Sequence, residues 1–435
     1  MALSAMRPRV SLKRLSILTV AIYLLVSFYW AYVLLSQKSS DTSGARSDKR
    51  AQDSRILSLA VNLGTTQQRH HEPAKESNIS KTHDVLLAKN TYSDAKEEHA
   101  VEIWSRAGVG QYTWEHILGA TLETRQQVDS QYTLSYGNKK EGNIAFTFRT
   151  GHDVLPSTVP RDVENLLLVL NARAPDKVDF ARAWLDNLDA FPHLRNVGLM
   201  LIGSEQCQNS WVLQYMKSHG GPLRFLLVVY DTLLVDGREI LQWPLGVATY
   251  RGFPVVNITK LNPRASRRYR CNFMATIYPN SSRETLLQVI KKNNLADYCY
   301  VKTRESWTAT EQEETRLEYE GILAQSDLTL SPVGMNTECY RIYEAASYGS
   351  VPVVEDITTP GECASEPLRL LKQYNAPFIY IKDWQQLPQV LLEESKKSPR
   401  EISQRREELL RWYGQFRIKL KQVLLDTIQK SFFPT

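Results

Sequence analysis

The 435-residue chain lacks the two short motifs that most often indicate a bound metal ion. It has no Cys-x-x-Cys pair, so nothing indicates a structural zinc site. It has no Asp-x-Asp either, the paired carboxylates that commonly hold a divalent cation on a diphosphate. We therefore expect no metal cofactor, with a cation bound by dispersed carboxylates as the open alternative. His70-His71 stands in a polar stretch without further ligands and is interpreted as loop histidines.

Cysteine and surplus charge are also scarce. In an oxidising compartment five cysteines permit two disulfides and one free thiol, in a connectivity that spacing does not fix; they are Cys207, Cys271, Cys299, Cys339 and Cys363. The net charge of +6 is too diffuse to indicate nucleic acid. No internal repeat or heptad pattern is evident, and the 43% hydrophobic content is typical of a globular protein.

Only one uncharged run, residues 15–35, is long enough to cross a bilayer as a helix. Four basic residues precede it: Arg7, Arg9, Lys13 and Arg14. This pattern predicts a signal-anchor with residues 1–14 in the cytosol and the remainder in the secretory lumen. The alternative is a cleaved signal peptide, which would have a shorter apolar region and a small-residue cleavage site. Val33–Gln37 offers no such site.

Residues 36–100 are polar, with few aromatics, and we interpret them as a flexible lumenal stem. Three acceptor sequons, at Asn78, Asn257 and Asn280, are compatible with the lumen, although chance gives about as many in a chain of this length.

After residue 100, short apolar runs alternate with helical patterns. The first series predicts strands at 165–170, 197–202 and 224–230, and helices at 178–188 and 210–218. The second predicts strands at 270–277, 298–302, 327–331, 351–354 and 378–381, and helices at 283–292, 310–324, 338–348 and 368–374. This alternation is typical of parallel sheets covered on both faces.

We therefore expect an α/β protein with two Rossmann-like, doubly wound domains facing a cleft. The predicted domains are 101–262, for an acceptor, and 263–399, for a nucleotide-sugar. A long amphipathic helix within 400–435 is expected to cross back and brace the first domain.

Residues 328–354 predict, in this order, a strand, a glycine-containing loop, a helix, a turn at a glycine and a second strand. Such a loop delivers the chain to a helix N-terminus, where free N–H groups favour an anion, and Asn336 or Thr337 is the expected N-cap. Arg341 and Glu344 are three apart and share a helix face. The guanidinium of Arg341 could pair with the oxygens of a diphosphate, and the carboxylate of Glu344 could accept hydrogen bonds from a ribose diol. A simple surface ion pair is the alternative.

This block resembles the nucleotide-sugar motif of exostosin-like glycosyltransferases. The matching residues are Pro332 and Gly334, Arg341, Glu344 and Ala345, Gly349, and Val351–Val354. Val333 departs from the pattern, because those enzymes often have Arg there. The phosphate contact is therefore expected from another basic residue. The candidates are Arg268 and Arg270, before the second domain's first strand, and Arg283, which opens a predicted helix.

A more specific resemblance, to the ribitol-5-phosphate xylosyltransferase family, runs from about residue 101 to the C-terminus. It is strongest in Trp114–Ile117, Gln242–Arg251, Cys271–Phe273 and Asn336–Asp356. The resemblance implies a type II Golgi membrane enzyme that moves xylose, with inversion, from UDP-xylose to ribitol 5-phosphate. The acceptor would lie on the O-mannosyl glycan of α-dystroglycan, with other glycosyltransferases of the pathway as partners. The alternatives are an exostosin-like transferase using another UDP-sugar, or a non-catalytic glycan-binding protein of the lumen.

An inverting transfer needs a base that removes the proton of the incoming hydroxyl. Asp231 and Glu205 each follow a predicted strand of the first domain, where a sheet presents functional groups. Glu115 and His116 lie in an aromatic-rich entry segment. All four are candidates for the base; each alternatively caps a helix or satisfies a backbone group.

Overall fold

The computed structural model describes residues 98–126, 133–308 and 310–434, which all belong to one compact unit. The predicted anchor at 15–35, almost all of the stem and the sequon at Asn78 lie outside these residues. Among the described helices, none has both the length and the apolar character that a membrane span requires.

The N-terminal half is built on an eight-stranded sheet in the order β2-β3-β4-β1-β5-β6-β7-β8. Its strands are β1 (His99–Ser105), β2 (Glu123–Gln126), β3 (Thr133–Glu141), β4 (Ile144–Thr150), β5 (Asn165–Asn171), β6 (Asn196–Ile202), β7 (Leu223–Val229) and β8 (Ile240–Trp243). The three predicted strands are confirmed as β5, β6 and β7. The sheet is parallel except for β3, which pairs antiparallel with both of its neighbours, β2 and β4.

The helices of this half are mostly short. They are α2 (Gly108–Tyr112), the π-helix η1 (Thr113–Ile117), α3 (Pro175–Asp186), and the 3-10 segments at Pro156–Thr158, Leu188–Ala190, Ser210–Tyr215, Lys217–His219, Thr249–Arg251 and Ile258–Lys260. The single helix predicted at 210–218 is wrong. Met216 is extended (φ −72°, ψ 145°) and divides that stretch into two 3-10 turns.

The C-terminal half is built on a five-stranded parallel sheet in the order β10-β9-β11-β12-β13. Its strands are β9 (Tyr269–Thr276), β10 (Cys299–Arg304), β11 (Ser326–Ser331), β12 (Val351–Glu355) and β13 (Ile379–Ile381). Its helices are α4 (Ser282–Lys292), α5 (Glu313–Ala324), α6 (Tyr340–Ser347), α7 (Arg369–Gln373) and α8 (Leu387–Ser395), with 3-10 turns at Leu295–Asp297 and Trp384–Gln386.

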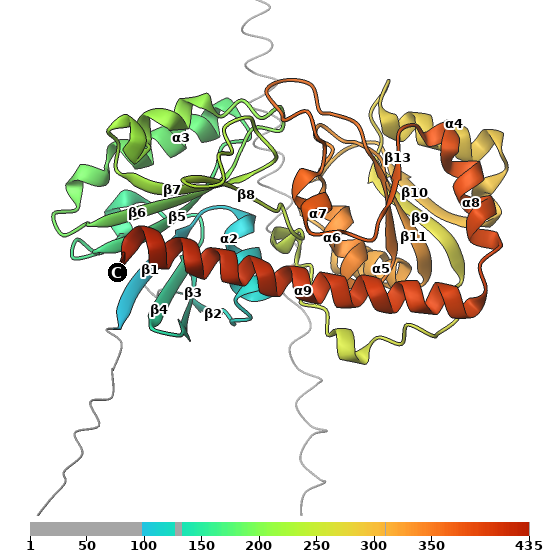
Figure 1. The fold of residues 1–435 in the computed structure, drawn as a ribbon, viewed down its shortest axis with the longest axis horizontal. Helices are drawn as coiled ribbons and strands as arrows, with labels where there is room; N and C mark the ends of the chain where they lie inside the picture. The colour runs from blue at the N-terminus through green and yellow to red at the C-terminus, as the bar shows by residue number, and fades with distance from the viewer. Residues whose placement is uncertain (1–97, 127–132, 309, 435) are drawn as a thin grey trace, which may run out of the picture. The chain divides into compact units, whose positions relative to one another are not determined.

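This order is doubly wound, and it reverses between β9 and β11 (Figure 1). Ligands of such sheets bind beyond the carboxyl ends of the strands at that switch point. The predicted α/β class with parallel sheets is therefore confirmed, and the fold itself indicates where to look for a site.

The last helix, α9 (Pro399–Phe432), extends along both halves (Figure 1). It contacts β6, β7 and η1 of the N-terminal half and α6 of the C-terminal half. Its buried residues recur at helical spacing, among them Leu409, Tyr413, Phe416 and Leu420. The helix begins with a capping box in which Ser398 and Glu401 bond reciprocally. The two sheets are thus tied together by one continuous apolar face.

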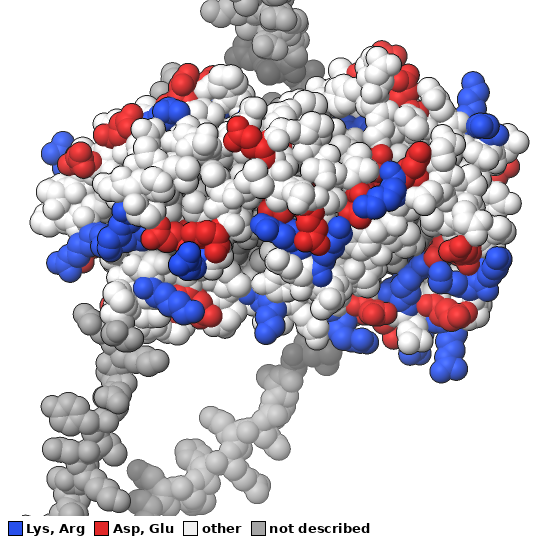
Figure 2. All heavy atoms as spheres, turned by 45° about the horizontal axis from the view of Figure 1, so that its top comes forward, with Lys and Arg blue, Asp and Glu red and all other residues white. Residues whose placement is uncertain are grey.

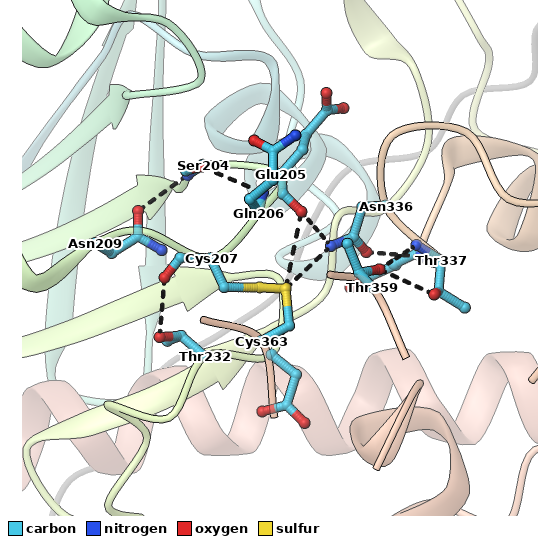
Figure 3. The surroundings of a disulfide bond; sticks show 12 residues. Ser204, Glu205, Gln206, Cys207, Asn209, Thr232, Asn336, Thr337, Thr359 and Cys363 are labelled. Atoms are coloured by element: carbon cyan, nitrogen blue, oxygen red, sulfur yellow. Dashed lines mark hydrogen bonds between the residues drawn. A yellow bond between two sulfur atoms is a disulfide. The ribbon is translucent and has the colours of Figure 1, made fainter. Parts of the chain in front are cut away.

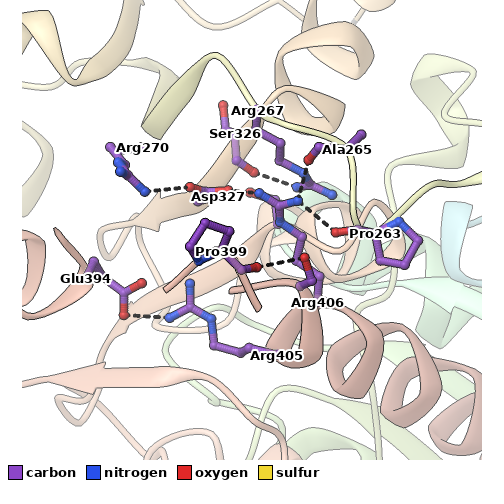
Figure 4. A network of polar contacts seen from close by, with 12 residues as sticks. Pro263, Ala265, Arg267, Arg270, Ser326, Asp327, Glu394, Pro399, Arg405 and Arg406 are labelled. Carbon is purple, nitrogen blue, oxygen red and sulfur yellow. Dashed lines mark hydrogen bonds and ion pairs between the residues drawn. The ribbon is translucent and has the colours of Figure 1, made fainter. Parts of the chain in front are cut away.

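A buried ion pair anchors α9 to the C-terminal half (Figure 4). The guanidinium of Arg406 is paired with Asp327 and donates to the carbonyls of Pro263 and Ala265 at 2.8 and 2.7 Å. Arg267 donates to the carbonyl of Ser326 at 2.6 Å. Much of the arginine-rich segment before β9 therefore serves to hold the fold.

We expect Arg406→Ala to lower the free energy of unfolding by about 3–5 kcal/mol, because it removes the buried partner of the Asp327 carboxylate and leaves only the longer contact with the half-exposed Arg270. Urea unfolding of the two proteins measures the difference. Arg264→Ala is the matched control, because Arg264 pairs with Glu407 on the same helix but its side chain is 80% exposed. Its effect should stay below about 1 kcal/mol. Equal losses in the two variants would contradict this account.

Candidate functional site

Two arginine side chains meet where the strand order of the C-terminal sheet reverses. Arg283, at the start of α4, donates from Nη1 to the carbonyl of Thr276 at 2.8 Å. Arg341, in the first turn of α6, donates from Nη2 to the carbonyl of Met274 at 3.2 Å. Both carbonyls belong to the last residues of β9. The loops after β9 and β11 thus bring together two guanidiniums separated by more than fifty residues of sequence.

This pair carries charge that the described residues do not neutralise. Within the described ranges, neither Arg283 nor Arg341 forms an ion pair with a carboxylate, and the Nε atom of each is buried without a hydrogen-bond partner. Burial, and then the proximity of Arg341, lower the pKa of Arg283. Burying unpaired cations costs free energy, and a bound anion would offset that cost.

Elsewhere, acidic and basic side chains are interspersed, as the face in Figure 2 shows. The local surplus at Arg283 and Arg341 is therefore the more notable feature.

Gly334, in the loop after β11, lies directly against this pair. A Cβ atom added to it would stand 2.7 Å from Nη2 of Arg283. The glycine therefore lets the guanidinium approach the loop backbone closely. Such close approach is a common use of glycine at anion-binding loops.

Asn336 and Thr337 do not cap α6 as predicted. The helix begins at Tyr340, so Cys339 occupies the N-cap position. Asn336 instead donates from Nδ2 to the carbonyl of Glu205 in the N-terminal half at 2.7 Å. Thr337 donates to the carbonyl of Ile357 at 2.7 Å. The polar side chains of this loop therefore bind neighbouring segments and do not cap the helix.

Glu344 shares α6 with Arg341 but the two are not ion-paired. Its carboxylate accepts hydrogen bonds from the Ala248 N–H at 3.0 Å and the Tyr319 hydroxyl at 2.7 Å. Burial raises its pKa. The alternative of a simple surface ion pair is therefore wrong. In this structure Glu344 ties α6 to α5 and to the segment that joins the halves.

The N-terminal half is fastened across the site by a disulfide, Cys207–Cys363 (Figure 3). The Glu362 N–H donates to the carbonyl of Gln206 at 2.8 Å, and the Ala364 N–H to that of Asp231 at 2.9 Å. The second disulfide, Cys271–Cys299, joins β9 to β10, and Cys339 is the free thiol. The first disulfide brings the carboxyl end of the N-terminal sheet against the loops of the C-terminal sheet.

Glu205 and Asp231 both lie at this edge, in different states. The carboxylate of Asp231 is paired with Arg369 at 2.6 Å and its side chain is 9% exposed. Burial raises its pKa, whereas Arg369 opposes that shift. The carboxylate of Glu205 is 32% exposed, lies 4.0 Å from Arg173 and accepts a 3.3 Å hydrogen bond from Tyr230. In Figure 3 it points away from the disulfide. Glu205 is thus the more available proton acceptor.

The structure does not bring the other predicted residues to this edge. His116 is buried in η1, which contacts α9, and burial lowers its pKa to about 4. Glu115, on the same turn, accepts from Gln111 at 3.0 Å. Arg268 is exposed and Arg270 lies 3.5 Å from Asp327. Both arginines stand at the amino end of β9, whereas the site lies at its carboxyl end.

The sequence interpretation missed two charged residues, the half-buried Arg173 and the buried Glu338. Arg173 follows β5 at the same sheet edge as Glu205 and Asp231, so the rule that selected those two would have found it. Glu338 accepts a hydrogen bond from the Leu245 N–H at 2.8 Å and another from the Tyr343 hydroxyl. Burial raises its pKa to about 7. No sequence pattern distinguishes Glu338 from a surface carboxylate.

The Glu338 carboxyl makes stability depend on pH. Its folded pKa of about 7 exceeds the usual 4.5, so the folded state holds the proton more tightly. The stabilisation that the protonated Glu338 carboxyl gives to the folded state is therefore fully present below pH 4.5 and is lost as the pH rises through 7. We expect Glu338→Gln to be more stable than the parent at pH 8, on the order of 3 kcal/mol, and to lose this advantage at pH 5. Unfolding measured at both values tests this; a constant difference would contradict it.

The chain is similar to known proteins along nearly its whole length. The family model described as RXYLT1 N-terminal domain matches residues 101–244, and RXYLT1 C-terminal domain matches residues 250–433. A zebrafish (Danio rerio) relative named ribitol-5-phosphate xylosyltransferase 1 is 40% identical, over 97% of this chain and 98% of its own. The mouse (Mus musculus) protein of that name is 40% identical over 98% and 99%, and the human (Homo sapiens) one 38% over 98% and 98%.

Among solved structures, an α1,3-fucosyltransferase aligns with 78% of this chain and 92% of its own at 10% identity. Its TM-score of 0.34 is too low to bear on fold or function.

Proposed function

Because the chain belongs to the ribitol-5-phosphate xylosyltransferase family, we propose that it transfers xylose from UDP-xylose to ribitol 5-phosphate. The observation that carries this proposal is the pair of unneutralised guanidiniums, Arg283 and Arg341, at the switch point of the C-terminal sheet. Two adjacent positive charges with free N–H groups match the charge and the oxygens of a nucleoside diphosphate.

In the proposed reaction the two halves act as the facing domains of a GT-B type enzyme. The C-terminal half holds UDP-xylose with its diphosphate against Arg283, Arg341 and the loop at Gly334. Positive charge at this place stabilises the negative charge that develops on departing UDP. The guanidiniums supply the role that a divalent cation has in other transferases, so we expect the reaction to need no metal.

The N-terminal half supplies the base. The acceptor hydroxyl attacks the anomeric carbon, forming the new glycosidic bond as the bond from that carbon to the UDP oxygen breaks. UDP leaves with the electron pair, and the hydroxyl proton passes to the Glu205 carboxylate. A single displacement of this kind inverts the anomeric centre and requires no covalent intermediate.

We further propose that the protein is a type II membrane protein of the Golgi that modifies the O-mannosyl glycan of α-dystroglycan, beside other glycosyltransferases of the pathway. The run at residues 15–35 and its basic flank support the topology. Two disulfides support an oxidising compartment, and the sequons at Asn257 and Asn280 are exposed. The acceptor and the Golgi rest on the family resemblance.

The test is to incubate the purified full-length protein with ribitol 5-phosphate and a panel of UDP-sugars, with and without EDTA, and to weigh the product. The proposal predicts the mass of one pentose added from UDP-xylose, equally in EDTA. Transfer of another sugar would favour a different exostosin-like activity. No transfer by folded protein would favour a glycan-binding role.

A further inference from the structure

We propose that Arg173 binds the phosphate group of the acceptor and so makes the protein select a phosphorylated alditol over a neutral one. This inference rests on the proposed function, since it concerns the acceptor side of the same site. Arg173 follows β5, at the carboxyl edge of the N-terminal sheet.

The guanidinium of Arg173 is held in place by two aromatic rings from opposite halves. Its Cζ atom lies 5.4 Å from the ring centre of Tyr230 and 5.5 Å from that of Tyr340. It also donates a hydrogen bond to the Tyr230 hydroxyl. Tyr230 itself has a positive φ of 70°, a backbone state that costs free energy for a bulky residue and is concentrated at functional sites.

The charge of Arg173 is only weakly compensated. In the described part of the chain its one ion-pair contact is Glu205, at 4.0 Å from Nε, and that Nε atom is buried without a hydrogen-bond partner. Yet 22% of the side chain is exposed, so Arg173 is not fully closed off from solvent. A preorganised cation with unused donors is suited to bind phosphate oxygens.

The position beside Glu205 identifies the anion as the acceptor's. If Glu205 removes the proton, the reacting hydroxyl must lie within hydrogen-bond reach of it. An anion bound by Arg173 then lies only a few bonds from that hydroxyl. An alditol phosphate has this arrangement of groups, whereas the donor diphosphate already has Arg283 and Arg341.

The test compares ribitol 5-phosphate with ribitol as acceptors for the parent protein, Arg173→Gln and Arg173→Lys. We expect Arg173→Gln to raise the KM for ribitol 5-phosphate about 10- to 100-fold, as expected for the loss of a charged hydrogen bond, and to abolish the preference over ribitol. Arg173→Lys keeps the positive charge but lacks the planar, forked guanidinium. Its KM for ribitol 5-phosphate should therefore lie between those of the parent and of Arg173→Gln. Calorimetry should give the same Kd for UDP in all three proteins.

Three results would overturn the inference. An unchanged preference in Arg173→Gln would show that Arg173 does not recognise the phosphate. A weaker Kd for UDP with the acceptor KM unchanged would place Arg173 on the donor. A fall in thermal midpoint with equal loss for both acceptors would make it a brace between Tyr230 and Tyr340. If the parent protein transfers nothing to ribitol 5-phosphate, the proposed function itself fails, so the two failures are distinguishable.

Discussion

Arg341→Ala should raise the Kd for UDP about 10- to 100-fold, because it removes a charged, partly buried donor from the diphosphate. It should also lower kcat about 100- to 1,000-fold, since the lost charge faces the group on which negative charge develops. Arg283→Ala should act in the same direction. Calorimetry with UDP and initial rates with UDP-xylose measure the two effects separately.

The matched control for these variants is Arg268→Ala. Arg268 is an arginine of the same half, but it is exposed at the amino end of β9, beside the ring of Tyr269. Its replacement should leave Kd and kcat within about twofold of the parent. If Arg268→Ala weakened UDP binding and Arg341→Ala did not, the donor would bind at the opposite edge of the sheet.

Glu205→Gln should lower kcat about 100- to 10,000-fold while leaving the Kd for UDP nearly unchanged, because it removes the proton acceptor and keeps the shape of the side chain. Initial rates at saturating UDP-xylose measure this. The loss belongs to the chemical step, whereas that of Arg341→Ala appears in binding as well.

Asp231→Asn provides the comparison for Glu205→Gln. The Asp231 carboxylate is buried in an ion pair with Arg369, so its replacement should mainly weaken the contact between the halves. We expect a lower thermal midpoint and a kcat within about tenfold of the parent. A large loss of kcat in Asp231→Asn, with an active Glu205→Gln, would make Asp231 the base.

The parts of the fold that could be predicted are those whose residues are buried on all sides. The strands β5, β6, β7 and β12 are near-continuous apolar runs, as is typical of a parallel sheet covered on both faces. Strand β4 escaped prediction because buried residues alternate along it with half-buried ones. Its polar face resembles a loop in the sequence.

The candidate site was predictable only for residues that follow a parallel strand in the sequence, because such residues lie at the carboxyl edge of the sheet. Arg341 and Gly334 follow β11, and Arg283 follows β9, so all three reach the carboxyl edge. Arg268 precedes β9 and Arg270 is its second residue, so both lie at its amino end. A basic cluster in the sequence does not indicate at which edge of the sheet it lies. Arg173 and Glu205 follow the neighbouring strands β5 and β6 of one sheet. Their contacts with Tyr340 and Asn336 of the other half depend on the Cys207–Cys363 disulfide and α9, and such long-range contacts leave no local pattern.

The most direct test of the account is a crystal structure of residues 98–434 in complex with UDP. The account predicts the diphosphate beyond the carboxyl ends of β9 and β11, with its oxygens within hydrogen-bond distance of both Arg283 and Arg341 and its outer phosphate facing Glu205. A diphosphate bound elsewhere, for example beside Arg268 and Arg270 at the amino end of β9, would contradict it.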